Sequence, residues 1–126
     1  MSNHRGRVPF TFPISVAQGA DERLRQQLPE DGTIEQIVVF FPRGTRTDLR
    51  LTLKGAEEPI NEAEPTDDSS DIPDYIVGSG TTYRWDVGIE MYEGQTIGVD
   101  ADNVSDVSDL DALVTMTVDY SKGVSA

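Results

Sequence analysis

Side chains able to act as a catalytic base or nucleophile are scarce in this chain, apart from carboxylates. There is no cysteine, and the single histidine is His4, close to the N-terminus. A Ser–His–Asp or Cys–His unit needs a histidine that is held in place, and a histidine-based zinc site needs ordered ligands. Because residues near a chain terminus tend to fray, His4 is a poor candidate for either role.

Carboxylates could still act in pairs. Asp86 and Glu90 fall on one face of an expected strand, beside Tyr83 and Trp85. A glycosidase places two carboxylates about 5 to 10 Å apart in a cleft. The simpler interpretation is that both acids project into water from the polar face of the strand. We therefore expect no catalytic residue and no enzyme, and a small carboxylate-dependent glycosidase is the remaining catalytic alternative.

Acidic side chains could also bind a metal ion. Asp100, Asp102, Asn103 and Asp106 offer the oxygen ligands that suit Ca²⁺ or Mg²⁺, but they lack the glycine and terminal glutamate of an EF-hand loop. The alternative is a turn in which Asp and Asn side chains cap their own backbone. The sequence leaves open whether Asp100, Asp102 and Asp106 bind a divalent cation, and it assigns no metal or cofactor site. A weaker acidic group is formed by Asp67, Asp68, Asp71 and Asp74.

Five aromatic residues could form a platform for a sugar ring: Phe40, Phe41, Tyr83, Trp85 and Tyr120. They occur in segments that alternate with a period of two, which favours the hydrophobic core over a binding surface. The Gly78–Gly80 segment lacks the following helix and the lysine of a phosphate-binding loop.

The segments that must position these residues have the pattern of β-strands. Apolar and polar residues alternate, as expected where one face of a strand is buried. The expected strands are Phe10–Val16, Thr33–Phe41, Thr47–Lys54, Tyr75–Val77, Thr82–Met91, Gln95–Asp100 and Ala112–Tyr120.

Two of these strands have predictable places in a sheet. Pro13 cannot donate a ladder hydrogen bond, which predicts an edge strand or a bulge. The second half of Thr33–Phe41 is apolar on both faces, which predicts a central strand. Strict alternation assigns Ile34 to the face of Gln36 and Val38, opposite Ile37.

The remaining segments read as connections. Residues 20–28 are the only helix-like stretch, and we expect a single turn or an extended connection there. The short link from Phe41 to Thr47 predicts a hairpin or a corner at which the chain changes sheets. Residues 57–74, rich in Pro, Ser and acids, predict a long acidic loop. Residues 1–8 should form a flexible basic arm and residues 121–126 a C-terminal tail.

Length and hydropathy favour one domain. The chain has 126 residues, and its longest apolar stretch, Ile37–Phe41, is far too short to cross a bilayer. No apolar run of signal-peptide length follows the N-terminus. We expect a single domain over residues 1–126, an all-β antiparallel sandwich with about seven to eight strands.

The charge is strongly negative. The chain has 23 acids against 10 cations, a net charge of −13, and only two of the cations are lysines. Phosphate binding needs a basic patch, so we expect no nucleic-acid partner. Few lysines and many aspartates resemble the proteins of haloarchaea, in which salt screens the self-repulsion. An ordinary acidic protein is the alternative.

The order of segments resembles that of jelly-roll-like virion structural proteins of tailed viruses that infect haloarchaea. The similar pieces are PFTFPISV, GTIEQIVVFFPRGTRTDLRLTLK, TTYRWDVGIEMYEGQTIGVDADN and DALVTMTVDY. The resemblance implies a non-catalytic head decoration, turret or tail component, located in the virion and without a membrane. Its partners would be copies of itself and other virion proteins such as the major capsid protein. The alternative is a β-sandwich module that binds a receptor or a host surface glycan.

Overall fold

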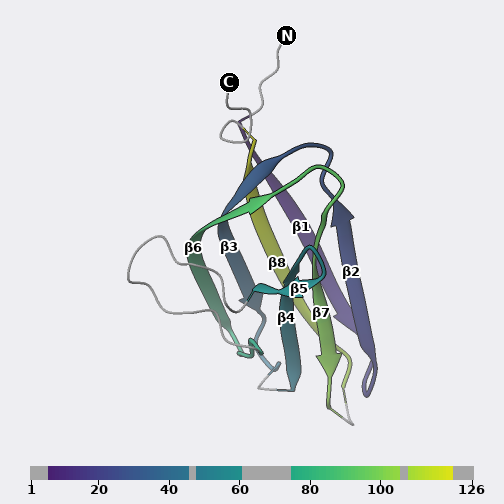
Figure 1. Ribbon diagram of the computed structural model, residues 1–126. Helices are drawn as coiled ribbons and strands as arrows, with labels where there is room; N and C mark the ends of the chain where they lie inside the picture. The colour runs from purple at the N-terminus through teal and green to yellow at the C-terminus, as the bar shows by residue number, and fades with distance from the viewer. Residues whose placement is uncertain (1–5, 46–47, 61–74, 106–107, 121–126) are drawn as a thin grey trace.

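The computed structural model describes residues 6–45, 48–60, 75–105 and 108–120. They form eight antiparallel strands in two four-stranded sheets, which confirms the all-β sandwich predicted from the sequence (Figure 1). The strands are β1 (Arg7–Val16), β2 (Asp21–Gln27), β3 (Gly32–Phe41), β4 (Leu49–Gly55), β5 (Glu58–Pro59), β6 (Thr81–Met91), β7 (Thr96–Asn103) and β8 (Leu110–Asp119). Among these residues, no helix has the length and apolar character needed to cross a membrane.

The strand order is that of a jelly roll. Sheet A has the order β1-β8-β3-β6 and sheet B the order β2-β7-β4-β5. The pairs β1–β8, β2–β7, β3–β6 and β4–β5 are those of one long hairpin with its tip between β4 and β5. Rolling that hairpin adds the pairs β3–β8 and β4–β7, which gives the eight-stranded double-sheet arrangement. The chain therefore changes sheets between β3 and β4. Of the two alternatives predicted for this link, a hairpin or a corner between sheets, the structure has the corner.

Alternating apolar residues fill the space between the two sheets. Leu49, Leu51 and Leu53 of β4 are all buried, and they face core residues of sheet A such as Ile37 and Val114. This is the one-sided pattern that the sequence predicted for β4. Burying such side chains contributes about 1.5–3 kcal/mol each, which makes this layer the main source of stability.

Of the five aromatic residues assigned to the core, Phe41, Trp85 and Tyr120 are buried in it, and Tyr83 is partly buried and packs against it. Tyr83 stacks on Trp85 with ring centroids 5.7 Å apart, and its edge faces Phe41 at 6.2 Å. The prediction was wrong for Phe40, which is 41% exposed. Because neighbouring residues of a strand point to opposite faces, the inward position of Phe41 turns Phe40 outward.

A β-bulge corrects the predicted orientation of Ile34. The register of β3 shifts between Ile34 and Gln36 against both neighbouring strands. Against β8 the extra residue is Glu35, which turns Ile34 to the same side as Ile37, and both are fully buried. β3 lies between β8 and β6, so its predicted central position is confirmed.

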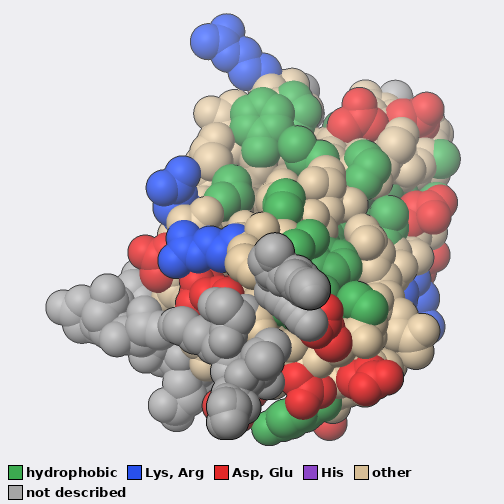
Figure 2. Space-filling view, turned by 90° about the horizontal axis from the view of Figure 1, so that it is seen from above, with side chains coloured by type: hydrophobic (Ala, Val, Ile, Leu, Met, Phe, Trp, Pro, Cys, Tyr) green, Lys and Arg blue, Asp and Glu red, His purple; other side chains and the backbone are tan. Residues whose placement is uncertain are grey.

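β1 is an edge strand of sheet A, as Pro13 predicted, but it begins earlier than expected. Arg7 and Val8, assigned to a flexible arm, pair with Asp119 and Val118 of β8. The remainder of that arm, residues 1–5, and the predicted tail lie outside the described residues. At this end of the sandwich, hydrophobic side chains gather in the middle of the surface and acids lie toward its margins (Figure 2).

Residues 20–28 are also corrected, since most of them form strand β2. Leu24 packs against the core while Arg23 and Arg25 point outward, so the segment alternates with the period of a strand. The predicted strand Tyr75–Val77 is reduced to a single bridge between Ile76 and Leu51.

The predicted long loop begins later than residue 57. β4 and β5 form a tight hairpin whose two turn residues, Ala56 and Glu57, have φ of 54° and 66°. Ile60, directly after β5, is buried in the core, and residues 61–74 lie outside the described residues. A two-residue hairpin turn of this kind prefers Asn-Gly, because left-handed φ values crowd a Cβ atom. The turn between β4 and β5 is therefore strained.

Replacing Ala56 with glycine should relieve part of this strain. The left-handed conformation costs about 1–2 kcal/mol for alanine, and glycine adds about 0.5–1 kcal/mol of chain entropy, so the free energy of unfolding should rise by about 0.5–1 kcal/mol. Equilibrium urea denaturation measures the change. Ala112→Gly, inside β8, is the matched control and should lower stability. A similar loss from both variants would contradict strain at Ala56.

Candidate functional site

The outer face of sheet B carries most of the charged side chains that the fold brings together. The register aligns three rows across β2, β7 and β4, which are Asp21–Asp102–Arg50, Arg23–Asp100–Thr52 and Arg25–Gly98–Lys54. Asp100 and Asp102 therefore belong to a regular strand and not to the loop that the sequence suggested. Their spacing of two places both carboxylates on the outer face.

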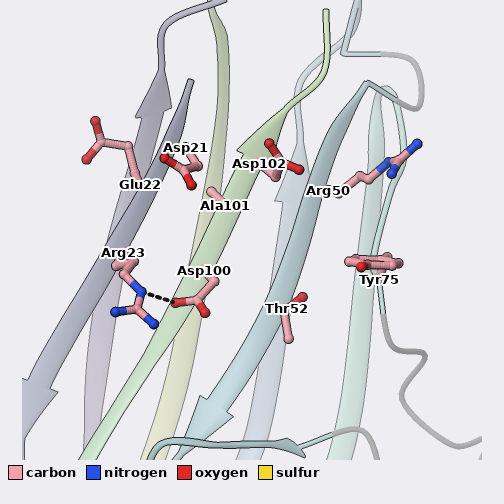
Figure 3. Close-up of a pocket in the computed structure, with 9 residues that line it drawn as sticks. All are labelled: Asp21, Glu22, Arg23, Arg50, Thr52, Tyr75, Asp100, Ala101 and Asp102. Carbon is pink, nitrogen blue, oxygen red and sulfur yellow. Dashed lines mark ion pairs between the residues drawn. The ribbon is translucent and has the colours of Figure 1, made fainter. Parts of the chain in front are cut away.

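A shallow hollow of about 290 Å³ lies over the first two rows (Figure 3). Asp21 lies on the β2 side of the hollow, Tyr75 and Arg50 lie on the opposite side, and Asp102 stands between them. The guanidinium carbon of Arg50 is 5.8 Å from the centroid of the Tyr75 ring, within the range of a cation–π contact. The hollow thus combines an exposed aromatic ring with charged groups of both signs.

Below the hollow, Arg25 lies flat across the backbone of β7 at Gly98. A Cβ atom at Gly98 would clash with the carbonyl oxygen of Leu24 and with the Arg25 side chain, so this position requires glycine. The absence of a side chain at Gly98 lets the Arg25 guanidinium reach in three directions. It donates to the Leu24 carbonyl at 2.9 Å, to Glu57 at 2.9 Å, and pairs with Asp100 at 2.8 Å.

The contacts of Arg25 join β2, β7 and the strained turn. Thr96 on β7 donates its hydroxyl to Glu57 at 2.7 Å, and the amide of Ala56 donates to the Thr96 carbonyl at 2.7 Å. The hydrogen bond from Arg25, followed by that from Thr96, lowers the pKa of Glu57. Burial lowers the pKa of Arg25, but the hydrogen bonds that Arg25 donates to Glu57 and Asp100 outweigh this effect and raise that pKa overall.

Asp100 contacts cations of the protein itself. Besides Arg25, its carboxylate lies 3.8 Å from Arg23 and 3.8 Å from Lys54. Among the described residues, no three histidines or acids are placed to hold a metal ion. Asp106 and the weaker acidic group between Asp67 and Asp74 lie outside the described residues, as does His4.

The carboxylate pair considered for a glycosidase does not converge. Asp86 and Glu90 are four residues apart on β6, which is about 13 Å in an extended strand and wider than such a pair requires. Asp86 accepts a hydrogen bond from Gln36 at 3.4 Å, and Glu90 accepts one from the Tyr92 hydroxyl at 3.1 Å. Both acids are exposed, as the polar-face interpretation predicted.

Sequence reasoning missed the hollow and the role of Arg25. The charges of β2 gave no sign of strand character, and their neighbours on β4 and β7 follow only from the register. The available signal was Gly98 inside an expected strand, because an interior glycine often marks a close approach by another group.

The sequence matches no protein-family model and no curated protein. Among solved structures, it is similar to FLHE, with a TM-score of 0.43, 9% identity, and coverage of 90% of this chain and 97% of that one. It is similar to PliG of Aeromonas hydrophila, a periplasmic inhibitor of g-type lysozyme, with a TM-score of 0.42, 8% identity and coverage of 94% and 92%. A protein of the T13 particle of IBDV aligns with a TM-score of 0.45 and 9% identity over 91% of this chain and 31% of the viral chain. Similarity this low assigns no function.

Removing the carboxylate of Glu57 should change how stability depends on pH. Because the pKa of Glu57 is lower in the folded chain, its contribution is complete above its ordinary pKa of 4.5 and is lost as the pH falls through the folded-state pKa. Glu57→Gln should therefore flatten the loss of stability on acidification. Thermal unfolding from about pH 7 to about pH 3 measures this.

Arg25→Gln should flatten the same acid limb, and the double variant should flatten it by less than the sum of the two single changes, since both changes remove the Arg25–Glu57 pair. An acid limb of unchanged slope in Glu57→Gln would contradict the assigned role of this ion pair.

Proposed function

We propose that this chain is a non-catalytic structural protein of a virion, a head or tail component of a halophilic archaeal tailed virus. In this role it assembles with copies of itself and with other virion proteins such as the major capsid protein. The observation that carries the assembly part of the proposal is the contrast between the outer faces of the two sheets. Eight-stranded jelly rolls are common in capsid and lectin domains, which supports the viral part by analogy.

The outer face of sheet A has a middle without charged side chains, although the chain as a whole carries −13 and Arg84, Asp86, Glu90 and Asp111 lie toward the margins of this face. We call its middle the uncharged face; it consists of Pro9, Thr11, Pro13, Gln36, Val38, Phe40, Thr82, Leu113, Thr115 and Thr117. Phe40 and Leu113 are directly opposite each other in the β3–β8 register and are 41% and 39% exposed. An exposed apolar centre within a neutral surface is typical of a contact face.

The charge distribution suits assembly in concentrated salt. At about 1 M salt the Debye length is about 3 Å, so repulsion between acidic copies is largely screened. Ion pairs that persist there should be close and bidentate, as those of arginine are. Arg25 and Glu57 have this geometry, with N–O distances of 2.9 and 3.3 Å.

Light scattering of the purified chain tests the assembly proposal. We expect a discrete oligomer at about 1 M salt and a smaller species at about 0.1 M, because repulsion between copies grows as the Debye length increases from about 3 to about 10 Å. A chain that remains strictly monomeric in molar salt, alone and with virion partners, would contradict the proposal.

Glycan binding is a second candidate function, and the hollow on sheet B favours it. Tyr75 is 58% exposed and offers an apolar ring face, while Arg50, Thr52 and Asp102 could hydrogen-bond to hydroxyl groups around it. Trp85, which a sugar platform on β6 would have used, is buried and takes no part.

The variant Tyr75→Ala distinguishes glycan binding from a function limited to assembly. If the hollow binds a host glycan, a glycan array should detect binding by the wild-type chain, and Tyr75→Ala should weaken it at least about tenfold, or about 1.4 kcal/mol. Tyr92→Ala is the matched control, because Tyr92 is also largely exposed, at 54%, and lies outside the hollow. Equal binding by both variants would exclude the hollow as the glycan site.

A further inference from the structure

We infer that the uncharged face of sheet A is the surface through which two copies of this chain associate about a two-fold axis. The inference rests on the proposed function and names one interface for it. It follows from the positions of Phe40, Leu113, Val38 and two flanking charges of opposite sign, Asp111 and Arg84.

Asp111 and Arg84 lie symmetrically on opposite sides of Phe40. In the register of sheet A, Phe40 stands between Leu113 of β8 and Thr82 of β6. Asp111 is two residues before Leu113, and Arg84 is two residues after Thr82. Because β8 and β6 both run antiparallel to β3, the two charges are displaced in opposite directions along the strands. With strands about 4.8 Å apart and residues about 3.3 Å apart, each charge lies about 8 Å from Phe40.

This arrangement is complementary to itself. In a two-fold interface, if residue i of one copy contacts residue j of the other, then j also contacts i. Consider a two-fold axis that lies in the plane of the interface, passes through Phe40 and is perpendicular to the line from Asp111 to Arg84. Rotation about this axis exchanges the positions of Asp111 and Arg84. Each Asp111 then faces Arg84 of the other copy, and the two Phe40 side chains meet at the axis. Both charged side chains are exposed, and neither forms an ion pair within the described residues.

The same axis brings apolar side chains together. On a regular sheet it places Leu113 of one copy next to Val38 of the other. Asp86 falls over Ser15 of the other copy, so the arrangement opposes no two like charges on this face. A second copy presents one acid and one base at the matching positions. A different, strongly acidic partner would attract Arg84 but repel Asp111.

The outer face of sheet B does not provide an equivalent surface. Three of its cations, Arg23, Arg25 and Lys54, already lie within 3.8 Å of Asp100. Its first row opposes Asp21 and Asp102 directly. The contrast between the faces favours sheet A as the contact between copies.

The uncharged face spans four strands, about 19 Å, and about 20 Å along them. This footprint is at the low end for a specific interface, so we expect association that depends on protein concentration. In a particle, further contacts at other surfaces would add to it by multivalency.

Charge exchange between Asp111 and Arg84 tests the inference. Asp111→Arg opposes arginines across the axis, and Arg84→Asp opposes aspartates, so each variant alone should self-associate at least about tenfold more weakly than wild type. A mixture of the two variants restores both attractive pairs and should form heterodimers about as tightly as wild type. Sedimentation at about 0.15 M salt, repeated at about 1 M, measures each dissociation constant.

Leu113→Asp tests the apolar centre independently. It should abolish the dimer, whereas Val104→Asp, which replaces a similarly exposed valine (44% against 39%) outside this face, should leave it intact. Thermal unfolding confirms that each variant is folded.

The outcomes separate the interface from the function. A wild-type oligomer that survives Leu113→Asp, or a mixture that regains no affinity, would overturn the assigned interface and leave the assembly proposal standing. A wild-type chain that is monomeric in molar salt, alone and with virion partners, would overturn both.

Discussion

The structure depends on one constraint, which is that two sheets must bury their facing side chains against each other. Residues at every second position of β1, β3, β4, β6, β7 and β8 supply that layer, and the chain has no disulfide to assist it. The bulge at Glu35 serves this burial, because it allows Ile34 to join the buried layer while β3 remains paired with β6 and β8. All charged groups are then left for the two outer faces and the connections.

The two outer faces differ in how they carry charge. On sheet B, Gly98 lets Arg25 lie flat, so that a guanidinium neutralises Glu57 and Asp100 and fastens a strained turn. On sheet A, threonine, proline and a few apolar residues leave a surface that another molecule can approach without strong repulsion.

The fold class and most of the core could be predicted from the sequence, because alternation reports directly which face of a strand is buried. The jelly-roll character was implied by the resemblance to virion proteins and not by alternation. Prediction from the sequence failed where the cause is not local. The orientation of Ile34 was predicted wrongly because of a β-bulge, and that of Phe40 because Phe41 points into the core. Both features depend on the neighbouring strands. β2 was not recognised, because Leu24 is its main apolar contribution to the core. The hollow and the Asp111–Arg84 diagonal follow only from register, which a single sequence does not reveal.

The prolines of β1 hinder edge-to-edge pairing of sheets from different chains. β1 borders sheet A, and Pro9 and Pro13 deprive this border of two backbone N–H groups. A strand from another chain therefore cannot extend the sheet with a complete ladder, and runaway fibre growth at high protein concentration is discouraged. Copies that met at high protein concentration would thus be directed to side-chain contacts, which can be reversed and corrected.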